Sequence, residues 1–265
     1  MEDLKEFKNF AEDFVRRAGK IMLENFELGM KRDWKSDNTP VTEADLAINS
    51  LLIKEVKEQF SGHGVKGEEQ SALTGSEEYI WVCDPIDGTL PFSHGIPIAT
   101  SSLALTKNGE SILGAVYDPF QDRLFSAVKG GGAYLNGKKI SVSKATQLKG
   151  SVGEFEVSDI SKYNIIPLIE SLIGQGAKML KFSSVIYASA LLAAGELSFA
   201  VYAGVNAHDA AAVKIIVEEA GGKVTDIYGN EQKYNDKING FIASNGLIHD
   251  KLVEMSKQLV KLRNP

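Results

Sequence analysis

The fold of this chain depends on residues 81–89, which read Trp81-Val82-Cys83-Asp84-Pro85-Ile86-Asp87-Gly88-Thr89. An apolar strand here runs into a tight turn that carries a pair of carboxylates. Pro85 fixes its own φ and biases Asp84 toward extended backbone, so the strand stops and the carboxylate points outward from its carboxyl end. Carboxylates about 4 Å apart repel by roughly 4 kcal/mol at an effective dielectric near 20. The turn therefore either binds divalent cations or raises the pKa of an aspartate.

The second half of the same turn is suited to an anion. Gly88 permits backbone conformations that are closed to other residues, and we expect Thr89 to cap a short helix whose first N–H groups are free. Ile86 can offer its carbonyl oxygen to a cation. The turn thus sets an anion site beside a cation site, which is the combination that a phosphate group needs.

The composition is that of a globular protein. The chain has 265 residues, of which 43% are hydrophobic, and a formal net charge of -6. This length suits one large domain or a pair of small ones. An acidic chain is a poor partner for a nucleic-acid backbone or an anionic membrane, because both attract basic surfaces. We therefore expect neither as a partner, and a small anionic substrate would need a bridging metal ion.

The cysteine content and the first residues predict the compartment. Cys83 is the single cysteine, which excludes an internal disulfide and fits a reducing environment. The start lacks the basic and apolar regions of a secretory signal. The apolar window 185–205 is interrupted by Glu196, which suits a buried helix and strand better than a membrane span. We expect a cytoplasmic protein.

The first half of the chain combines long helices with short strands. Apolar residues at helical spacing predict helices over 3–26 and 43–60, and Thr42 and Asp45 precede and open the second in the pattern of a capping box. Asn108-Gly109 and Asn136-Gly137 are hairpin turn pairs, so much of the sheet should be antiparallel. The strands of this half are predicted at 79–83, 100–106, 112–117, 123–128 and 140–142.

A polar stretch without periodicity at 143–150 predicts a boundary between an α+β half, residues 1–145, and an α/β half, residues 146–265. Helices and strands alternate in the second half. Strands are predicted near 151–155, 178–182, 198–202, 223–226 and 240–243, and helices near 161–173, 184–194, 209–220 and 246–262.

Two further stretches supply carboxylates. Gly67-Glu68-Glu69 lies shortly before the strand, in a loop from which acidic side chains could turn toward Asp84. Asp209 opens a predicted helix that stops at Gly221-Gly222. Taken alone, an acidic loop is commonly just solvated, and an aspartate at a helix start is commonly just a cap.

In this order and at these separations, the motifs resemble the inositol monophosphatase family. The resemblance spans nearly the whole chain, and although each motif is weak to moderate alone, the ordered set is highly specific. Upstream of the turn, Lys35 and Val41-Thr42-Glu43-Ala44-Asp45 are similar to the family's N-terminal Lys…Val-Thr-x-x-Asp signature. The other motifs are Gly67-Glu68-Glu69, Asp84-Pro85-Ile86-Asp87-Gly88-Thr89, His208-Asp209-Ala210-Ala211 and Glu218-Glu219-Ala220-Gly221-Gly222.

The resemblance implies an α+β fold, a layered αβαβα sandwich of the inositol monophosphatase and fructose-1,6-bisphosphatase type. It also implies a lithium-sensitive homodimer that uses two to three Mg²⁺ ions to hydrolyse a small phosphorylated metabolite. Residues 1–145 would carry most metal ligands, and residues 146–265 would supply Asp209 and the substrate side. Magnesium suits such a site because it takes a few carboxylates, keeps waters and shares phosphate oxygens.

Carried over by motif, the resemblance assigns the metal ligands. A first ion would be held by Glu68, Asp84 and the carbonyl of Ile86. A second would be held by Asp84, Asp87 and Asp209, and a weaker third ion would lie near Glu68. The implied mechanism is in-line attack on phosphorus by a water on the first ion while the second stabilises the leaving oxygen, without a phosphoenzyme.

The resemblance also assigns catalytic groups. Thr89, hydrogen-bonded to Asp45, and Glu68 would orient and deprotonate the attacking water. The backbone N–H groups of Gly88 and Thr89 would hold the phosphate.

Several positions depart from the family's pattern. Pro91 replaces the usual asparagine, and His208 replaces the usual tryptophan before the last metal aspartate. For His208 we expect a packing or surface role unless it touches substrate. Tyr202 stands where members that handle inositol often carry an acidic residue. The substrate-side residues assigned in this way are Ser183, Ser184, Tyr202 and His208.

The substrate therefore stays open. An inositol-monophosphate-like ester is the first expectation. The segments 37–45 and Gly95-Ile96-Pro97 are similar to histidinol-phosphate and nucleotide-bisphosphate members. The alternatives are a histidinol-phosphate phosphatase, a 3'(2'),5'-bisphosphate nucleotidase and a fructose-1,6-bisphosphatase.

Different classes of protein are also possible. Haloacid-dehalogenase phosphatases place D-x-D-x-T at a strand end, whereas Asp84 and Asp87 are spaced D-x-x-D. A catalytically impaired homologue that binds metal or phosphate is the non-enzymatic alternative. The intact Asp45, Glu68, Thr89 and three aspartates weigh against it, whereas the changes at Pro91, Tyr202 and His208 keep it open.

Overall fold

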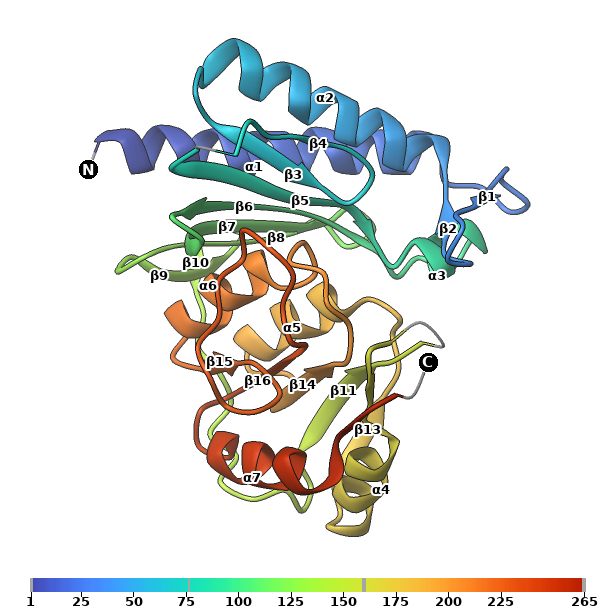
Figure 1. The fold of residues 1–265 in the computed structure, drawn as a ribbon, viewed down its shortest axis with the longest axis vertical. Coiled ribbons are helices and arrows are strands. Elements are labelled where there is room, and N and C mark those ends of the chain that lie inside the picture. Colours follow the sequence, from blue (N-terminus) through green and yellow to red (C-terminus); the bar gives the residue numbers. More distant parts are fainter. Residues whose placement is uncertain (1, 76, 159–160, 264–265) are drawn as a thin grey trace.

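The computed structural model describes residues 2–75, 77–158 and 161–263, and its elements lie in alternating layers of helix and sheet (Figure 1). One pair of helices covers the outer face of a large sheet, a second pair lies between this sheet and a smaller one, and a third covers the far side. The expected α+β sandwich of layers αβαβα is confirmed. From the outer layer inward the helices are α1 (Glu2–Glu24) and α2 (Glu43–Gln59), α5 (Val185–Ala193) and α6 (Ala211–Glu219), then α4 (Ile166–Gly174) and α7 (His249–Leu259), with the short α3 (Thr89–Ser93) at the edge.

The large sheet has the order β10-β9-β8-β7-β6-β5-β3-β4, and its neighbours are antiparallel apart from β3 and β5. The predicted Asn-Gly hairpins are confirmed. Asn108 and Gly109 have φ of 53° and 84°, the left-handed values that a tight hairpin needs. The strands are β3 (Gly64–Gly67), β4 (Ser71–Ala72), β5 (Tyr79–Asp87), β6 (Thr100–Lys107), β7 (Glu110–Asp118), β8 (Arg123–Val128), β9 (Gly132–Leu135) and β10 (Lys138–Lys139).

The smaller sheet has the order β13-β11-β14-β16-β15, in which β11 runs parallel to both of its neighbours. Among the helices in the described ranges, none combines the length and apolar character needed to cross a membrane. The remaining strands are β11 (Val152–Glu156), β13 (Lys178–Leu180), β14 (Phe199–Tyr202), β15 (Lys223–Thr225) and β16 (Phe241–Ser244), with the short pairs β1 (Asp33–Trp34) and β2 (Pro40–Val41), and β12 (Tyr163–Asn164) and β17 (Lys261–Leu262).

Two predicted helices are shorter than expected because their ends pair with each other. The helix predicted over 161–173 begins at Ile166, and the helix predicted over 246–262 spans His249–Leu259. Tyr163 pairs with Leu262 in the antiparallel ladder of β12 and β17. This pairing joins segments far apart in the chain, so local periodicity carries no sign of it.

The strand predicted at 140–142 is wrong. The N–H of Ile140 donates to Ala133 at 3.0 Å, but that of Val142 donates to Ala220 at 3.1 Å, at the end of α6. The chain therefore leaves the large sheet here and crosses to the middle layer.

Helix α6 packs directly on the large sheet at Gly114 of β7. A Cβ at this position would lie 2.7 Å from Cγ2 of Ile215 and 3.1 Å from the carbonyl oxygen of Ala212. Glycine is needed here because it lets the helix backbone approach the strand. Since Asp209 lies two residues before α6, this contact also sets how close Asp209 comes to the end of β5.

We expect Gly114→Ala to lower the free energy of unfolding by about 1–3 kcal/mol, because the added methyl group pushes α6 away from β7. Thermal unfolding followed by circular dichroism measures this. Gly174→Ala is the matched control, since no heavy atom lies within 4 Å of the added Cβ at the end of α4. That variant should match or slightly exceed the wild type. Equal melting temperatures for Gly114→Ala and wild type would contradict the packing argument.

Candidate metal centre

A β-bulge brings Asp84 and Asp87 to the same side of β5. Side chains three positions apart on a regular strand point to opposite faces. Here Asp84 pairs with Ser102 and Asp87 with Thr100, so three steps along β5 match two along β6 and the register shifts between them. The extra residue falls at Pro85-Ile86, where a proline is tolerated because a bulge interrupts the ladder. The strand was predicted to stop at Asp84-Pro85, but β5 continues to Asp87, and the bulge within it, instead of a turn after it, gathers both carboxylates at one point.

Asp84 lies at the centre of the acidic cluster. It is 2% exposed, and its Oδ1 accepts no hydrogen bond from any residue that the structure describes. Burial raises the pKa of Asp84 well above its ordinary value, and the charges of Glu68, Asp87 and Asp209 raise it further. A buried carboxylate with an unpaired oxygen is unstable as an anion unless a cation neutralises it.

The N-terminus of α5 holds Asp87 in place. Its Oδ2 accepts hydrogen bonds from Oγ of Ser184 at 2.5 Å and from the N–H groups of Ile186 at 2.9 Å and Tyr187 at 3.2 Å. Burial raises the pKa of Asp87 to about 8, although the Ser184 hydroxyl opposes this. Ser184 was assigned to the substrate side, but it is fully buried behind Asp87 and positions that carboxylate instead.

Asp209 reaches the cluster from the turn before α6, and Tyr202 orients it. The helix predicted from 209 begins at Ala211, which leaves Asp209 in the preceding turn. The Tyr202 hydroxyl donates to Oδ2 of Asp209. A Cβ at residue 204 would lie 2.1 Å from that hydroxyl oxygen, so Gly204 makes room for the contact. Burial raises the pKa of Asp209 to about 7. Tyr202, predicted to touch substrate, therefore acts on a carboxylate of the cluster.

The parallel pairing of β3 and β5 delivers Glu68. Gly67 pairs with Cys83, and the N–H of Glu68 donates to the Cys83 carbonyl at 3.1 Å, so Glu68 enters beside Asp84. This segment was expected to be a loop, but Gly67 ends a strand. Asn49 of α2 fixes the following residues, because its Oδ1 accepts the N–H of Glu69 at 3.3 Å. Asn49 was not predicted as a site residue, although a polar residue on the buried face of an amphipathic helix is a usable signal.

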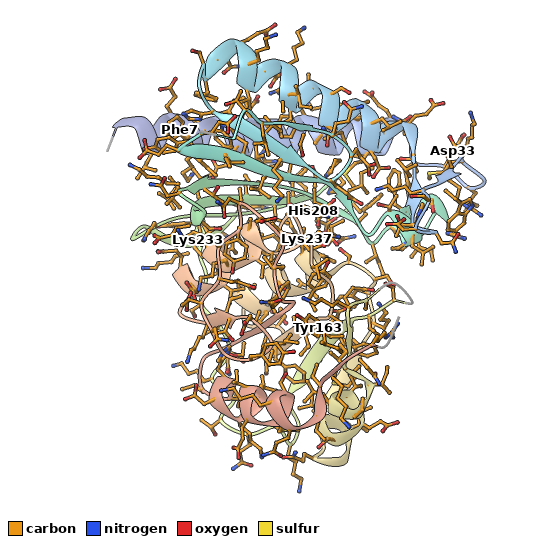
Figure 2. The ribbon with its side chains drawn as sticks, viewed as in Figure 1. Phe7, Asp33, Tyr163, His208, Lys233 and Lys237 are labelled. Carbon is orange, nitrogen blue, oxygen red and sulfur yellow. The ribbon has the colours of Figure 1, made fainter. Side chains whose placement is uncertain are left out.

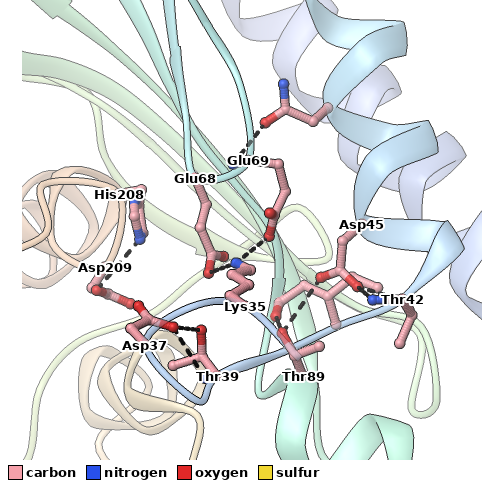
Figure 3. A network of polar contacts seen from close by, with 12 residues as sticks. Lys35, Asp37, Thr39, Thr42, Asp45, Glu68, Glu69, Thr89, His208 and Asp209 are labelled. Carbon is pink, nitrogen blue, oxygen red and sulfur yellow. Dashed lines mark hydrogen bonds and ion pairs between the residues drawn. The ribbon is translucent and has the colours of Figure 1, made fainter. Parts of the chain in front are cut away.

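Lys35 forms ion pairs with Glu68 and Glu69 (Figure 3). Its Nζ lies 2.8 Å from Oε1 of Glu68 and 2.5 Å from Oε1 of Glu69. Burial alone would lower the pKa of Lys35, but the glutamate charges more than offset this and the pKa lies above its ordinary value. The lysine supplies one positive charge. The carboxylates of the cluster are those of Glu68, Glu69, Asp84, Asp87 and Asp209, so most of their negative charge is not balanced by Lys35.

His208 also faces the cluster. Its side chain is 12% exposed, and Nε2 lies 3.7 Å from Oδ2 of Asp209. Burial lowers the pKa of His208, so the imidazole is held in its neutral form. The expected packing or surface role does not match this position, because His208 lines the same cavity as the carboxylates.

Asp45 and Thr89 form a second polar group at the edge of the site (Figure 3). The predicted capping box is confirmed, since the N–H of Thr42 donates to Oδ2 of Asp45 at 2.7 Å. The Thr89 hydroxyl lies 3.4 Å from Oδ1 of Asp45 but 2.7 Å from the Ile86 carbonyl. Its single hydrogen can serve only one acceptor at a time. Burial raises the pKa of Asp45 to about 7.

The predicted cap of α3 is corrected by one residue. Gly88, with φ of 91°, is the N-cap, and Thr89 is the first residue of the helix. A Cβ at residue 88 would lie 2.8 Å from the carbonyl oxygen of Ile98, so both the conformation and the space require glycine.

These groups open into a cavity of about 490 Å³. A larger cavity of about 600 Å³, lined by Ser111, Lys214 and Tyr234, contains none of the clustered aspartates and glutamates. The part of the smaller cavity's lining that lies outside the carboxylate cluster was not predicted, apart from Ser183. It is formed by Trp34, Asn38, Glu156, Ser158, Lys181, Ser183 and Asn206.

Known proteins share this arrangement of elements. Residues 3–261 match the model of the inositol monophosphatase family. The chain belongs to that family. A Thermotoga maritima protein named fructose-1,6-bisphosphatase/inositol-1-monophosphatase is 36% identical over 224 residues, 83% of this chain and 84% of the relative. Inositol monophosphatase 1 of Solanum lycopersicum is 35% identical over 237 residues, 86% of this chain and 87% of the relative. The solved structure of a Thermotoga maritima IMPase has a TM-score of 0.85 at 32% identity and covers 97% of this chain and 98% of its own.

Membership in this family identifies the general class of reaction. It is an inositol monophosphatase family phosphatase, and this family uses Mg²⁺. The ligand atoms of Asp84, Asp87 and Asp209 lie within 4.8 Å of one another, so one divalent ion can bridge them after small shifts. The names of the family relatives differ in substrate, so the relatives do not identify the ester that this chain hydrolyses.

The raised pKa values predict a pH-dependent effect of Mg²⁺ on stability. Asp87 and Asp209 titrate in the folded protein at about 8 and about 7, against 3.8 in the unfolded chain. Folding therefore takes up protons, and metal-free protein loses stability as pH rises from about 4 through about 8. Mg²⁺ must displace these protons, so the rise in melting temperature between EDTA and Mg²⁺ should be larger at pH 8.5 than at pH 6.5.

Differential scanning fluorimetry over pH 6.5–8.5 tests this. This pH range avoids the titration of His249. Burial lowers the pKa of His249 to about 4, so protonation of this residue destabilises the folded protein only below about pH 6.5. Asp209→Asn should reduce the pH dependence. An Mg²⁺-induced shift of equal size at both pH values would count against the carboxylate cluster as the binding site.

Proposed function

We propose that this chain is a Mg²⁺-dependent phosphomonoesterase that hydrolyses a small phosphorylated metabolite by direct attack of water, without a phosphoenzyme. The observation that carries the proposal is the convergence of Asp84, Asp87 and Asp209, whose ligand atoms lie within 4.8 Å of one another although Asp209 is far along the chain from the other two. The pKa of each aspartate is raised, first because the side chain is buried and also because other carboxylates lie nearby. Among the described residues, no lysine or arginine forms an ion pair with these three aspartates, which favours divalent cations as their partners.

The residues fit the ions that the family uses. Oδ1 of Asp84 is buried and accepts no hydrogen bond from the described residues, so it is available to a cation. We assign Glu68, Asp84 and the Ile86 carbonyl to a first ion, and Asp84, Asp87 and Asp209 to a second, with a third near Glu68. The Ile86 carbonyl accepts the Thr89 hydroxyl but keeps a second lone pair.

Side chains and backbone groups of the chain can activate the water and bind the phosphate. Bound Mg²⁺ supplies a water of lowered pKa and neutralises the phosphate oxygens. Asp45, with a pKa near 7, can accept a proton through Thr89, whose hydroxyl lies between Asp45 and the Ile86 carbonyl. Glu68 would help to orient the water, as the family resemblance implies. The N–H groups of Gly88 and Thr89 begin α3 and lack carbonyl partners within that helix, so they can bind the phosphate oxygens.

The substrate is proposed to be an inositol-monophosphate-like ester, with histidinol phosphate, nucleotide 3'(2'),5'-bisphosphate and fructose 1,6-bisphosphate as alternatives. A cavity of about 490 Å³ suits a sugar-sized or nucleotide-sized ester. Ser183 lines it with a left-handed φ of 56° and keeps its proposed substrate role. From the family resemblance we also propose a cytoplasmic homodimer that lithium inhibits.

Asp87→Asn is expected to lower turnover on the order of a hundredfold or more, because an amide is a poor magnesium ligand. The amide oxygen can still accept the hydrogen bonds from Ser184 and the start of α5, so the fold should persist. Asp226→Asn is the matched control. Asp226 is also buried and accepts backbone N–H groups, from Tyr228 at 2.9 Å and Asn230 at 2.7 Å, outside the metal centre. Steady-state phosphate release at saturating Mg²⁺, with circular dichroism as a fold check, measures the effect. Near-normal turnover of Asp87→Asn would refute the assignment.

A panel of phosphate esters separates the substrate alternatives. Phosphate release with and without Mg²⁺ is measured on inositol 1-phosphate, histidinol phosphate, fructose 1,6-bisphosphate and adenosine 3',5'-bisphosphate. We expect release only with Mg²⁺ and a preference for one ester of at least about tenfold in kcat/KM. Mg²⁺ binding by calorimetry without turnover of any ester would favour the catalytically impaired homologue.

A further inference from the structure

His208 lies at the edge of the metal centre. It lies in the turn between β14 and α6, directly before Asp209. Figure 2 places it at the level where the large sheet meets the middle layer of helices. In Figure 3 its ring projects toward the same side as the carboxylates of Glu68 and Asp209.

The imidazole is not committed to a hydrogen bond. Its Nε2 lies 3.7 Å from Oδ2 of Asp209, whereas N–H···O hydrogen bonds span about 2.7–3.2 Å. Within the described ranges of the chain, no hydrogen bond joins the His208 ring to another residue. A nitrogen lone pair is therefore available on a buried side chain that faces the cavity.

Glu68, Asp84 and His208 form a group with the spacing of metal ligands. Each offers one ligand atom, and these atoms lie within 4.8 Å of one another. An ion with bonds of about 2.0–2.2 Å holds its ligand atoms about 3–4.4 Å apart. Shifts of a few tenths of an ångström thus suffice to bring the three donors onto one ion.

Two further observations support a ligand role for this group. Oδ1 of Asp84 is buried without a partner among the described residues, so the group contains an unsatisfied acceptor. Lys35 contacts Oε1 of Glu68 and also Oε1 of Glu69, which leaves Oε2 of Glu68 outside the ion pair. The lysine can therefore stay on Glu69 while Glu68 turns an oxygen to a cation.

We propose that His208 is a nitrogen ligand of the ion held by Glu68 and Asp84. The inference rests on the proposed function, since it adds a donor to the same centre. The two positions of the centre then differ in chemistry. The ion among Asp84, Asp87 and Asp209 meets only oxygen, which suits Mg²⁺. The ion at His208 meets oxygen and nitrogen, a set that binds divalent transition ions such as Mn²⁺ and Co²⁺ more tightly than Mg²⁺.

Pulsed electron paramagnetic resonance on the full-length protein loaded with Mn²⁺ tests the assignment directly. We expect nitrogen hyperfine coupling from a bound imidazole in the wild type and its loss in His208→Asn. His94→Asn is the control, because the His94 ring contacts the Leu90 carbonyl outside the metal centre and its loss should leave the coupling intact. His208→Phe keeps a ring in place and serves as a second variant if His208→Asn is poorly folded.

Calorimetry with Co²⁺ and Mg²⁺ supplies the second readout. In His208→Asn the dissociation constant for Co²⁺ should rise by at least about tenfold and that for Mg²⁺ by less than about threefold. Absence of nitrogen coupling in the wild type, or equal losses for both ions, overturns the inference. Phosphate release with Mg²⁺ in that case would leave the proposed function standing, whereas nitrogen coupling without release of phosphate from any ester would sustain the ligand role and refute the function.

Discussion

Mutual repulsion among carboxylates at the end of β5 is the constraint around which this protein is organised. Each close pair costs roughly 4 kcal/mol at 4 Å and an effective dielectric of 20. Three of them are restrained mainly through one oxygen: Asp87 by the start of α5, Asp209 by the Tyr202 hydroxyl and Glu68 by Lys35. Asp84, at the centre, has an oxygen with no partner among the described residues. In Glu68, Asp87 and Asp209 one carboxylate oxygen is held by these contacts and the other can bind a cation. The contacts therefore keep mutually repelling carboxylates in position for cations.

The layered architecture makes this gathering possible. The bulge in β5 turns Asp84 and Asp87 to the same side, and the parallel strand β3 delivers Glu68 next to them. The middle helices α5 and α6 then meet the large sheet from below (Figure 1), one holding Asp87 at its N-terminus and the other preceded by Asp209. The centre therefore lies where both sheets contribute, and close packing such as that of α6 on Gly114 fixes distances within it.

Features encoded over a few residues could be predicted from the sequence. The capping box at Thr42, the Asn-Gly hairpins and the stop at Gly221-Gly222 follow from backbone preferences that act locally. The bulge could not be predicted, because a D-x-x-D spacing on a strand places its carboxylates on opposite faces until the register with β6 is known. Ser184 and Tyr202 were assigned to substrate for a similar reason. Their contacts with Asp87 and Asp209 depend on tertiary packing, and Ser184 lies 97 residues from its partner.

Tyr202, Ser184 and His208 lie beside the carboxylates, so other residues of the cavity must provide most of the contacts with a substrate. All three face the carboxylates, so under the proposed function they act on the metal centre and leave the rest of the cavity wall to contact the ester. That wall carries an ion pair between Lys181 and Glu156, with Nζ to Oε2 at 2.5 Å and side chains 36% and 23% exposed. A partly exposed pair of this kind contributes only about 0–1 kcal/mol, so breaking it to bind a charged or hydroxyl-rich substrate costs little. Under the proposed function, Lys181 and Glu156 can therefore exchange this ion pair for contacts with the ester at little cost.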